Sequence, residues 1–190
     1  MQFDDVIKNR KSVRSFKHKN VPWRKVLDAI DSARLGPFAD GLNHMKFLII
    51  EEPETIKKLA ASADQSWIEE AQSLIVVCSD DSNLEAMHGE RGRVYSRQQS
   101  GAAINTIMLK LTDLGIDSCW VGSFSDESIK QSLGIPGHIQ IEALIPMGYD
   151  SGKSKKKKKK DLENVLFWES WDTRKRPTML KEDVDKYGFR

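Results

Sequence analysis

A short basic segment near the N-terminus carries residue types that bind phosphate. Residues 10–16 read Arg-Lys-Ser-Val-Arg-Ser-Phe, which places three cations and two hydroxyls within six residues. Arginine offers a planar fork of donors and serine a short hydroxyl donor, so this set suits a phosphate ester. Val13 and Phe16 are the apolar residues expected to anchor the segment. A solvated basic turn has the same composition, and both interpretations stay open at this point.

A second candidate segment runs from residue 98 to residue 124. Its first part has small or apolar residues at helical spacing on most sides, which predicts a helix buried between layers or at a subunit contact. Gly115 favours a left-handed C-terminal cap. Residues 118–122, Ser-Cys-Trp-Val-Gly, then predict a short buried strand and a turn. Such a turn can present bare backbone amides to a flat aromatic cofactor, and plain core packing is the alternative.

Asn43 precedes a predicted strand, in the loop that follows Pro37. Its side-chain amide can offer a donor and an acceptor together to the edge of a ligand. Asparagine at such a position is also an ordinary turn former.

Composition limits the class of protein. The chain has 190 residues, 39% hydrophobic content and a net charge of +2, which fits one well-buried domain and does not indicate nucleic-acid binding. Cys78 and Cys119 lie in apolar runs without CxxC spacing, and the four histidines are scattered, so neither a disulfide framework nor a metal site is expected. No apolar run reaches membrane-spanning length, and no signal peptide is recognised. We expect a cytoplasmic protein without nucleic-acid or membrane partners.

Periodicity predicts mixed helices around one sheet, in a single domain over residues 1–190. Residues 80–92 are polar and are expected to form an irregular loop or a mobile cover. Helices are expected at 3–8, 22–36, 53–63, 66–71 and 125–133, and strands at 46–51, 73–79 and 139–148.

Six consecutive lysines, Lys155–Lys160, form the low-complexity feature of the chain. Such a run is usually a solvated loop, although it could bind nucleic acid or an acidic membrane, or direct one or two lysines onto a phosphate. Residues 166–190 contain exposed-looking Trp and Phe and are expected to pack on the body or on a second subunit.

Taken in their order along the chain, these segments resemble the FMN-dependent nitroreductase family, and the resemblance covers most of the chain. Residues 10–14 resemble its Arg-Arg-Ser-Val-Arg stretch, and Pro37 to Phe47 its Pro-Ser-x-x-Asn-x-Gln-Pro-Trp segment. Residues 102–122 resemble its long interface helix and the following strand. The remaining matches are Leu-Gly-Ile-Pro at 133–136, Ala-Leu-Ile-Pro-Met-Gly-Tyr at 143–149, and the lysine run with Leu-Glu after it.

The resemblance implies an α+β, three-layer fold with a central, mainly antiparallel sheet flanked by helices, in a homodimer whose subunits embrace one another. It also implies one FMN at each side of the interface. By motif match, Phe38, Ala39 and Asn43 would contact FMN from the partner chain, and the backbone of Trp120, Val121 and Gly122 would lie near its reactive face. The implied contacts to the phosphate, ribityl chain and pyrimidine edge are Arg10, Lys11, Ser12 and Arg14, with Lys157 and Lys159 as late phosphate contacts.

The implied activity is a two-step hydride exchange, in which NAD(P)H reduces FMN and a nitroaromatic, quinone or similar small acceptor reoxidises it. The flavin carries this chemistry, so no catalytic side chain is predicted. Flavin fragmentation and reductive dehalogenation are alternatives on the same scaffold, since substrate choice is expected within residues 80–97. A non-enzymatic binding module that acts through Lys155–Lys160 is the alternative from another class.

The sequence departs from the family pattern at three places. The Asn43 loop is about two residues longer than usual, and Met45-Lys46-Phe47 replaces Gln-Pro-Trp. Gln99 stands where an aspartate often opens the interface helix. These departures leave the expectation of FMN binding in place but remove the basis for inferring a substrate. The sequence therefore does not identify the acceptor.

Overall fold

The structure is a computed structural model, and it describes residues 1–154 and 160–174. The chain divides into two compact units, Met1–Ser154 and Lys155–Arg190, and each is described by itself. The first unit contains the sheet, the packed helices and the hydrophobic cores.

The described part of the second unit is short. It includes a 3-10 helix, η3 (Leu162–Asn164), and a contact between the rings of Phe167 and Trp171, whose centroids lie 4.7 Å apart. The expected docking of residues 166–190, and with it the single domain over residues 1–190, stays a prediction.

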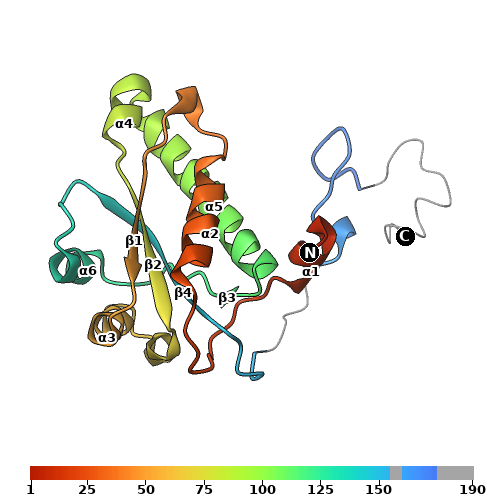
Figure 1. Ribbon diagram of the computed structural model, residues 1–190. Coiled ribbons are helices and arrows are strands. Elements are labelled where there is room, and N and C mark those ends of the chain that lie inside the picture. The colour runs from red at the N-terminus through yellow and green to blue at the C-terminus, as the bar shows by residue number, and fades with distance from the viewer. Residues whose placement is uncertain (155–159, 175–190) are drawn as a thin grey trace. The chain divides into compact units, whose positions relative to one another are not determined.

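The first unit is built on a four-stranded antiparallel sheet (Figure 1). The strands are β1 (Met45–Ile50), β2 (Ser73–Ser79), β3 (Asp117–Ser118) and β4 (Gln140–Gly148), in the spatial order β1-β2-β4-β3. All three strand pairings are antiparallel. The predicted strands at 46–51, 73–79 and 139–148 are therefore confirmed, as is the mainly antiparallel sheet.

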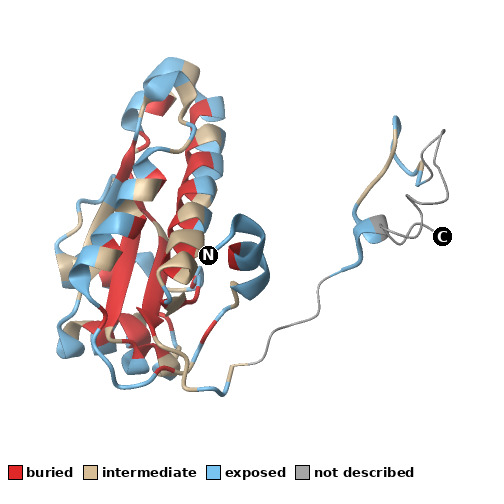
Figure 2. Ribbon diagram, turned by 45° about the vertical axis from the view of Figure 1, so that its right-hand side comes forward, coloured by how far each residue is buried: buried red, intermediate tan, exposed pale blue. Residues whose placement is uncertain are grey.

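Helices cover both faces of this sheet, which makes three layers (Figure 1). On one face, α2 (Trp23–Arg34) and α5 (Glu90–Asp113) share a core with alternate residues of the strands. On the other face, the second core is closed by α3 (Pro53–Ser62), the 3-10 helix η2 (Ser66–Glu70) and α6 (Asp126–Leu133). Figure 2 shows the buried residues concentrated in the sheet and on the inner sides of these helices.

The end of β2 leads into a helix that the sequence did not predict, and the predicted long helix begins earlier than expected. Residues 80–92 were expected to be irregular, but α4 (Ser82–His88) lies there, and α5 already begins at Glu90. Leu84 is fully buried and fixes α4 against α5, while Gly89 joins the two helices with a φ of 56°. A single apolar anchor in a polar stretch gives no periodic pattern, which is why the prediction was wrong.

Two helices also expose apolar residues. In α1 (Phe3–Asn9) only Val6 is buried, and Phe3 and Ile7 face outward. In α2 the buried residues are Val26, Ala29 and Ala33, whereas Leu27 and Leu35 are exposed. Apolar side chains on outer surfaces of two neighbouring N-terminal helices are typical of a covered interface.

Gly92 allows α4 and α5 to pack closely. A Cβ built on Gly92 would lie 2.1 Å from the Leu84 carbonyl oxygen and 2.4 Å from its carbon, both backbone atoms that cannot move alone. We predict that Gly92→Ala lowers the free energy of unfolding by about 1–3 kcal/mol, the usual cost of forced overpacking. Urea denaturation measures this difference.

Gly137→Ala is the matched control, since nothing lies within 4 Å of a Cβ at that glycine. Equal stability of the Gly92→Ala protein and the wild type would contradict the close packing of α4 on α5.

Candidate functional site

The segment after α1 completes the edge of the sheet. Ser12 forms a parallel bridge with Ser118 of β3, and the Val13 N–H donates to the Ser118 carbonyl at 3.1 Å. Phe16 forms an antiparallel bridge with Asp150. Val13 and Phe16 are both buried, which confirms them as the anchors of the segment. Their burial turns the residues between them outward.

Three of the predicted phosphate ligands gather at Cys119. Burial is the main cause that raises the pKa of the Cys119 thiol, and the charges of Arg14 and Arg10 and a Ser12 hydrogen bond partly oppose it. The Ser12 and Arg14 side chains therefore reach Cys119, at the start of the segment 119–122, and the Arg10 charge also acts on it. The raised pKa keeps Cys119 a thiol, so a nucleophilic role for it is not favoured.

Lys11 has a partner within its own chain. Its ammonium forms an ion pair with the carboxylate of Asp150, in the turn that follows β4. Burial raises the pKa of Asp150, but hydrogen bonds from Lys11 and from the Gly152 N–H, together with the Lys11 charge, outweigh it and hold the pKa below its ordinary value. Lys11 thus holds the 150–152 turn beside the Arg10 segment.

Residues 119–122 do not form the continuous strand that was expected. β3 ends at Ser118, and Val121 is connected to β4 by two hydrogen bonds with Leu144, at 2.9 and 3.0 Å. Val121 is buried, whereas Trp120 is 41% exposed and Gly122 is exposed. The Trp120 ring lies along α5, 4.0 Å from where a Cβ on Gly101 would be. The Cys119 N–H also donates to the Pro146 carbonyl at 3.2 Å, so Cys119 and Val121 are both held to β4, while Trp120 and Gly122 are exposed.

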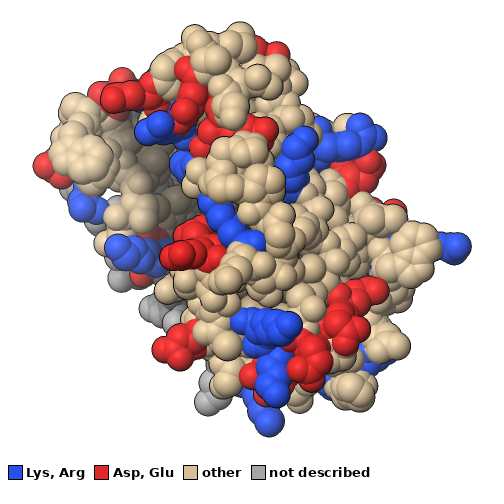
Figure 3. Space-filling view, turned by 90° about the vertical axis from the view of Figure 1, so that its left-hand side faces the viewer, with Lys and Arg blue, Asp and Glu red and all other residues tan. Residues whose placement is uncertain are grey.

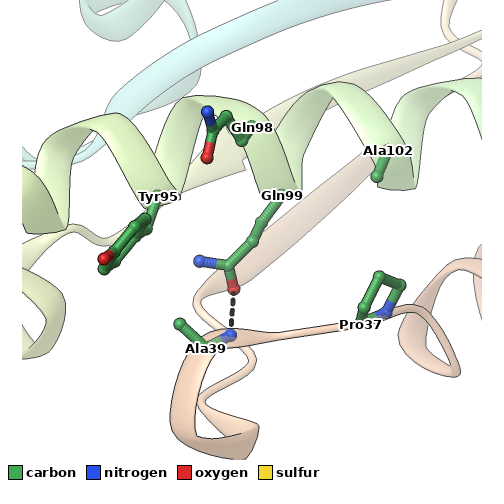
Figure 4. A pocket seen from close by; sticks show the side chains of 6 residues that line it. All are labelled: Pro37, Ala39, Tyr95, Gln98, Gln99 and Ala102. Carbon is green, nitrogen blue, oxygen red and sulfur yellow. Dashed lines mark hydrogen bonds between the residues drawn. The ribbon is translucent and has the colours of Figure 1, made fainter. Parts of the chain in front are cut away.

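The segment between α2 and β1 is held against α5. The Ala39 N–H donates to Gln99 Oε1 at 3.1 Å (Figure 4), and Phe38 packs on the α2–α5 core. In the 3-10 helix η1 (Ala39–Gly41), the carboxylate of Asp40 lies 2.7 Å from Nε2 of His88, at the end of α4. The segment is therefore anchored at two points.

Asn43 acts as a turn former in this chain, because its Oδ1 accepts a hydrogen bond from the Met45 N–H at 3.0 Å. The structure thus brings Arg10, Ser12 and Arg14 to the 119–122 segment. Phe38 and Ala39 lie elsewhere in the same chain, next to Gln99 of α5. Lys157 and Lys159 lie outside the described residues.

The sequence reading missed a buried polar network at the other end of β4. A β-bulge inserts Glu142 into the pairing with β2, and its carboxylate bonds both Arg97 of α5 and the Ser79 hydroxyl. The Arg97 guanidinium also pairs with Asp81, which is buried. In the sequence, the sole sign of this network is that charged residues occur within otherwise apolar elements.

Charge elsewhere is mixed. On the face shown in Figure 3, acidic and basic side chains are interspersed and neither sign forms a continuous patch. Among residues 1–154 and 160–174, no group of three His, Cys, Asp or Glu side chains has the arrangement of a metal site. Within the same residues, no helix has the length and apolar character needed to cross a bilayer.

The Lys11–Asp150 pair predicts a specific pH dependence. Because the folded state lowers the pKa of Asp150, the pair contributes stability at neutral pH that is lost as the pH falls through that lowered pKa. Asp150→Asn should therefore be less stable than the wild type at pH 7, and the difference should shrink toward pH 2. Urea unfolding across this range measures it.

Asp28→Asn, at an exposed carboxylate on α2, is the control and should show no such difference. A stability gap for Asp150→Asn that is constant with pH would contradict the ion pair.

The comparisons with known proteins agree with this architecture. The sequence model of the nitroreductase family matches residues 7–78 and 63–149. A Methanothermobacter thermautotrophicus protein, provisionally named an NADH dehydrogenase/NAD(P)H nitroreductase, is 27% identical over 150 residues, which cover 76% of this chain and 75% of the relative. An iodotyrosine deiodinase from Thermotoga neapolitana is 20% identical over 161 residues, or 76% of this chain and 87% of that protein.

Solved structures show the same fold. A nitroreductase family protein from Clostridium novyi NT superimposes with a TM-score of 0.74 and 26% identity, over 91% of this chain and 96% of that one. An FMN-dependent nitroreductase from Clostridium difficile R20291 gives a TM-score of 0.75 at 21% identity, over 87% and 98% of the two chains. Since the family match covers most of the sequence and the fold agrees, the chain belongs to the nitroreductase family.

Proposed function

We propose that this protein is an FMN-dependent oxidoreductase that uses NAD(P)H to reduce a small oxidised acceptor, such as a nitroaromatic or a quinone. The observation that carries the proposal is that Ser12, bridged to Ser118, and Arg14 reach Cys119, where the Arg10 charge also acts. The family match includes these residues, which supports FMN as their ligand. The names of relatives that use NADH or NAD(P)H support the choice of donor.

The donor set fits the cofactor chemically. Two guanidinium groups and a hydroxyl are a suitable set for the phosphate and ribityl oxygens, and their positive charge favours a ligand that gains negative charge. When bound, FMN would supply the hydride chemistry. Lys11 would keep the 150–152 turn in place through its ion pair with Asp150. We propose that it contributes to the cofactor site as a member of the 10–14 segment. Lys157 and Lys159 remain proposed phosphate contacts.

The segment 120–122 would provide the surface beside the flavin. Val121 is fixed to β4 through Leu144, so the backbone of Trp120 and Gly122 on either side of it is held in place, with the Trp120 side chain beside Gly122. A preorganised backbone needs no reorganisation when charge develops near it. No nucleophile is required, and the buried, high-pKa Cys119 thiol agrees with this. We therefore name no catalytic residue.

The first test is the absorption spectrum of the purified protein, repeated on the supernatant after heat denaturation. Flavin bands, with free FMN released at about one per chain, are the expected result for a flavin carrier of this family. A protein that stays colourless after incubation with FMN would refute the proposal.

Mutation of the basic segment tests the residue assignments. Arg10→Ala combined with Ser12→Ala should weaken FMN retention by about tenfold or more, because a charge-assisted and a neutral hydrogen bond are lost together. FMN fluorescence in the filtrate after dilution and ultrafiltration measures the released fraction.

Arg34→Ala combined with Ser32→Ala makes the same chemical change on α2 and is the control. Full FMN occupancy in the Arg10 and Ser12 double variant would remove these residues from the cofactor site.

The proposal includes a homodimer with α5 at its interface. Gln98, Ala102 and Asn105 of α5 are exposed at helical spacing, with short or uncharged side chains that allow close helix approach. The exposed apolar residues of α1 and α2 extend this surface: Phe3, Ile7, Trp23, Leu27 and Leu35. An apolar area of this kind on two helices favours a subunit contact. Phe38, Ala39 and Asn43 would then contact the flavin of the partner.

A charge at the middle of α5 tests the dimer. Asn105→Arg should convert a dimer into a monomer, since a two-fold interface would bring two buried arginines together. Light scattering coupled to gel filtration measures the mass. Asp126→Arg on α6 is the control, and an unchanged dimer of the Asn105→Arg protein would place the interface elsewhere.

Reductive dehalogenation is a second candidate function, because an iodotyrosine deiodinase is among the relatives. Release of iodide from iodotyrosine by the reduced protein would favour it over nitro or quinone reduction.

Flavin fragmentation would instead give a new, non-flavin product from reduced flavin and oxygen. A binding module that acts through Lys155–Lys160 would show steeply salt-dependent binding that is lost when these lysines become glutamine.

A further inference from the structure

The 3-10 helix η2 contacts the basic segment near the N-terminus through two of its side chains. The Glu70 carboxylate accepts hydrogen bonds from the Ser15 hydroxyl at 2.9 Å and from the Phe16 N–H at 3.0 Å. The guanidinium carbon of Arg14 lies over the Trp67 ring, 5.9 Å from its centroid. This helix therefore holds both the backbone of the segment and one of its cations.

The Trp67 ring is itself fixed in place. Its Nε1–H donates to Gln65 Oε1 at 3.2 Å, and the ring packs against the buried cluster that contains Val13 and Phe16. A cation within about 6 Å of the centre of such a ring is attracted to its face. Trp67 thus offers the long, exposed side chain of Arg14 a fixed surface to lie on.

This contact orients Arg14 without neutralising it. The Arg14 side chain meets the uncharged Trp67 ring and reaches the Cys119 thiol, which its raised pKa also keeps uncharged. Lys11, in the same segment, is instead paired with the carboxylate of Asp150. A guanidinium held by neutral groups keeps its charge and its donors for an anionic or polar ligand.

We propose that Trp67 is a positioning residue for the cofactor site: its ring holds the Arg14 guanidinium by a cation–π contact, so that this group has its place before FMN binds. The inference rests on the proposed function, in which Arg14 is one of the FMN contacts. Ordering a long side chain in advance removes part of the entropy cost of binding. Trp67 acts through Arg14 and needs no contact of its own with the cofactor.

Equilibrium dialysis of the FMN-loaded protein against a range of FMN concentrations measures this role without turnover. Trp67→Leu should weaken FMN binding about two- to fivefold, the effect of one exposed cation–π contact. Trp67→Phe keeps an aromatic face and should bind FMN within about twofold of the wild type. If the leucine variant does not fold, Trp67→Met takes its place with the same expected loss, because the flexible methionine side chain adapts to irregular space.

A mutant cycle with Arg14 separates positioning from packing. Since Trp67 acts through Arg14, Trp67→Leu should cause no further loss of FMN affinity in a protein that already carries Arg14→Gln. A side chain that only stabilises the fold would cause the same loss in both backgrounds. Ile139→Ala is the control, because Ile139 packs on the same core as Trp67 but belongs to another part of the chain. It should lower stability and leave FMN affinity unchanged.

Wild-type FMN affinity in Trp67→Leu would overturn the proposal. Equal losses with and without Arg14→Gln would overturn it too, as would a Trp67→Phe protein that binds FMN as weakly as Trp67→Leu. Failure of the proposed function is seen separately in the wild type. A protein that never retains FMN would contradict the cofactor and this inference with it, whereas one that retains FMN but oxidises neither NADH nor NADPH would contradict the oxidoreductase activity alone.

Discussion

The burial of β2 on both faces is the constraint on which the rest of the fold depends. All seven of its residues are buried, with Ile75 and Val77 in one core and Leu74, Val76 and Cys78 in the other. Each buried aliphatic side chain contributes about 1.5–3 kcal/mol, so a strand of this composition requires helices on both sides. β4 pairs with β2 and holds both β3 and Val121, which means that the candidate cofactor surface is fixed to the most buried strand of the chain.

The phosphate-binding character of the 10–14 segment follows from the need to cover a sheet edge. β3 pairs over only two residues, and Ser12 and Val13 complete its outer side. Because side chains alternate along an extended segment, the burial of Val13 places Ser12 and Arg14 on the opposite side, at Cys119. The segment that forms backbone hydrogen bonds with the edge strand β3 therefore also carries the cationic side chains to this place. Lys11 adds an ion pair that prevents the segment from separating from the 150–152 turn.

The elements with a clear period were predictable from the sequence, and those that depend on a single contact were not. β1, β2 and β4 were predicted to within a residue or so, as was α6, and Ser125 caps α6 by accepting from the Ser128 N–H. α4 was missed because Leu84 alone anchors it, and its fit against Gly92 depends on backbone atoms that no pattern records. The cation cluster was predictable, since its residues are adjacent in sequence. Its position at Cys119 was not, because that depends on an edge pairing between residues more than 100 positions apart.

The Arg97 network fixes the middle of α5 to the sheet. Burying Asp81 and Glu142 is costly unless both stay paired, so Arg97, which bonds both, fixes this turn of α5 to the ends of β2 and β4. Gln99 follows two residues later on the same rigid helix. The 39–41 segment is held against α5 and α4 by other bonds, from the Ala39 N–H to Gln99 and between Asp40 and His88. Since α5 and the 39–41 segment are both fixed in place by these bonds, a cofactor or a partner subunit that meets them would order few further groups.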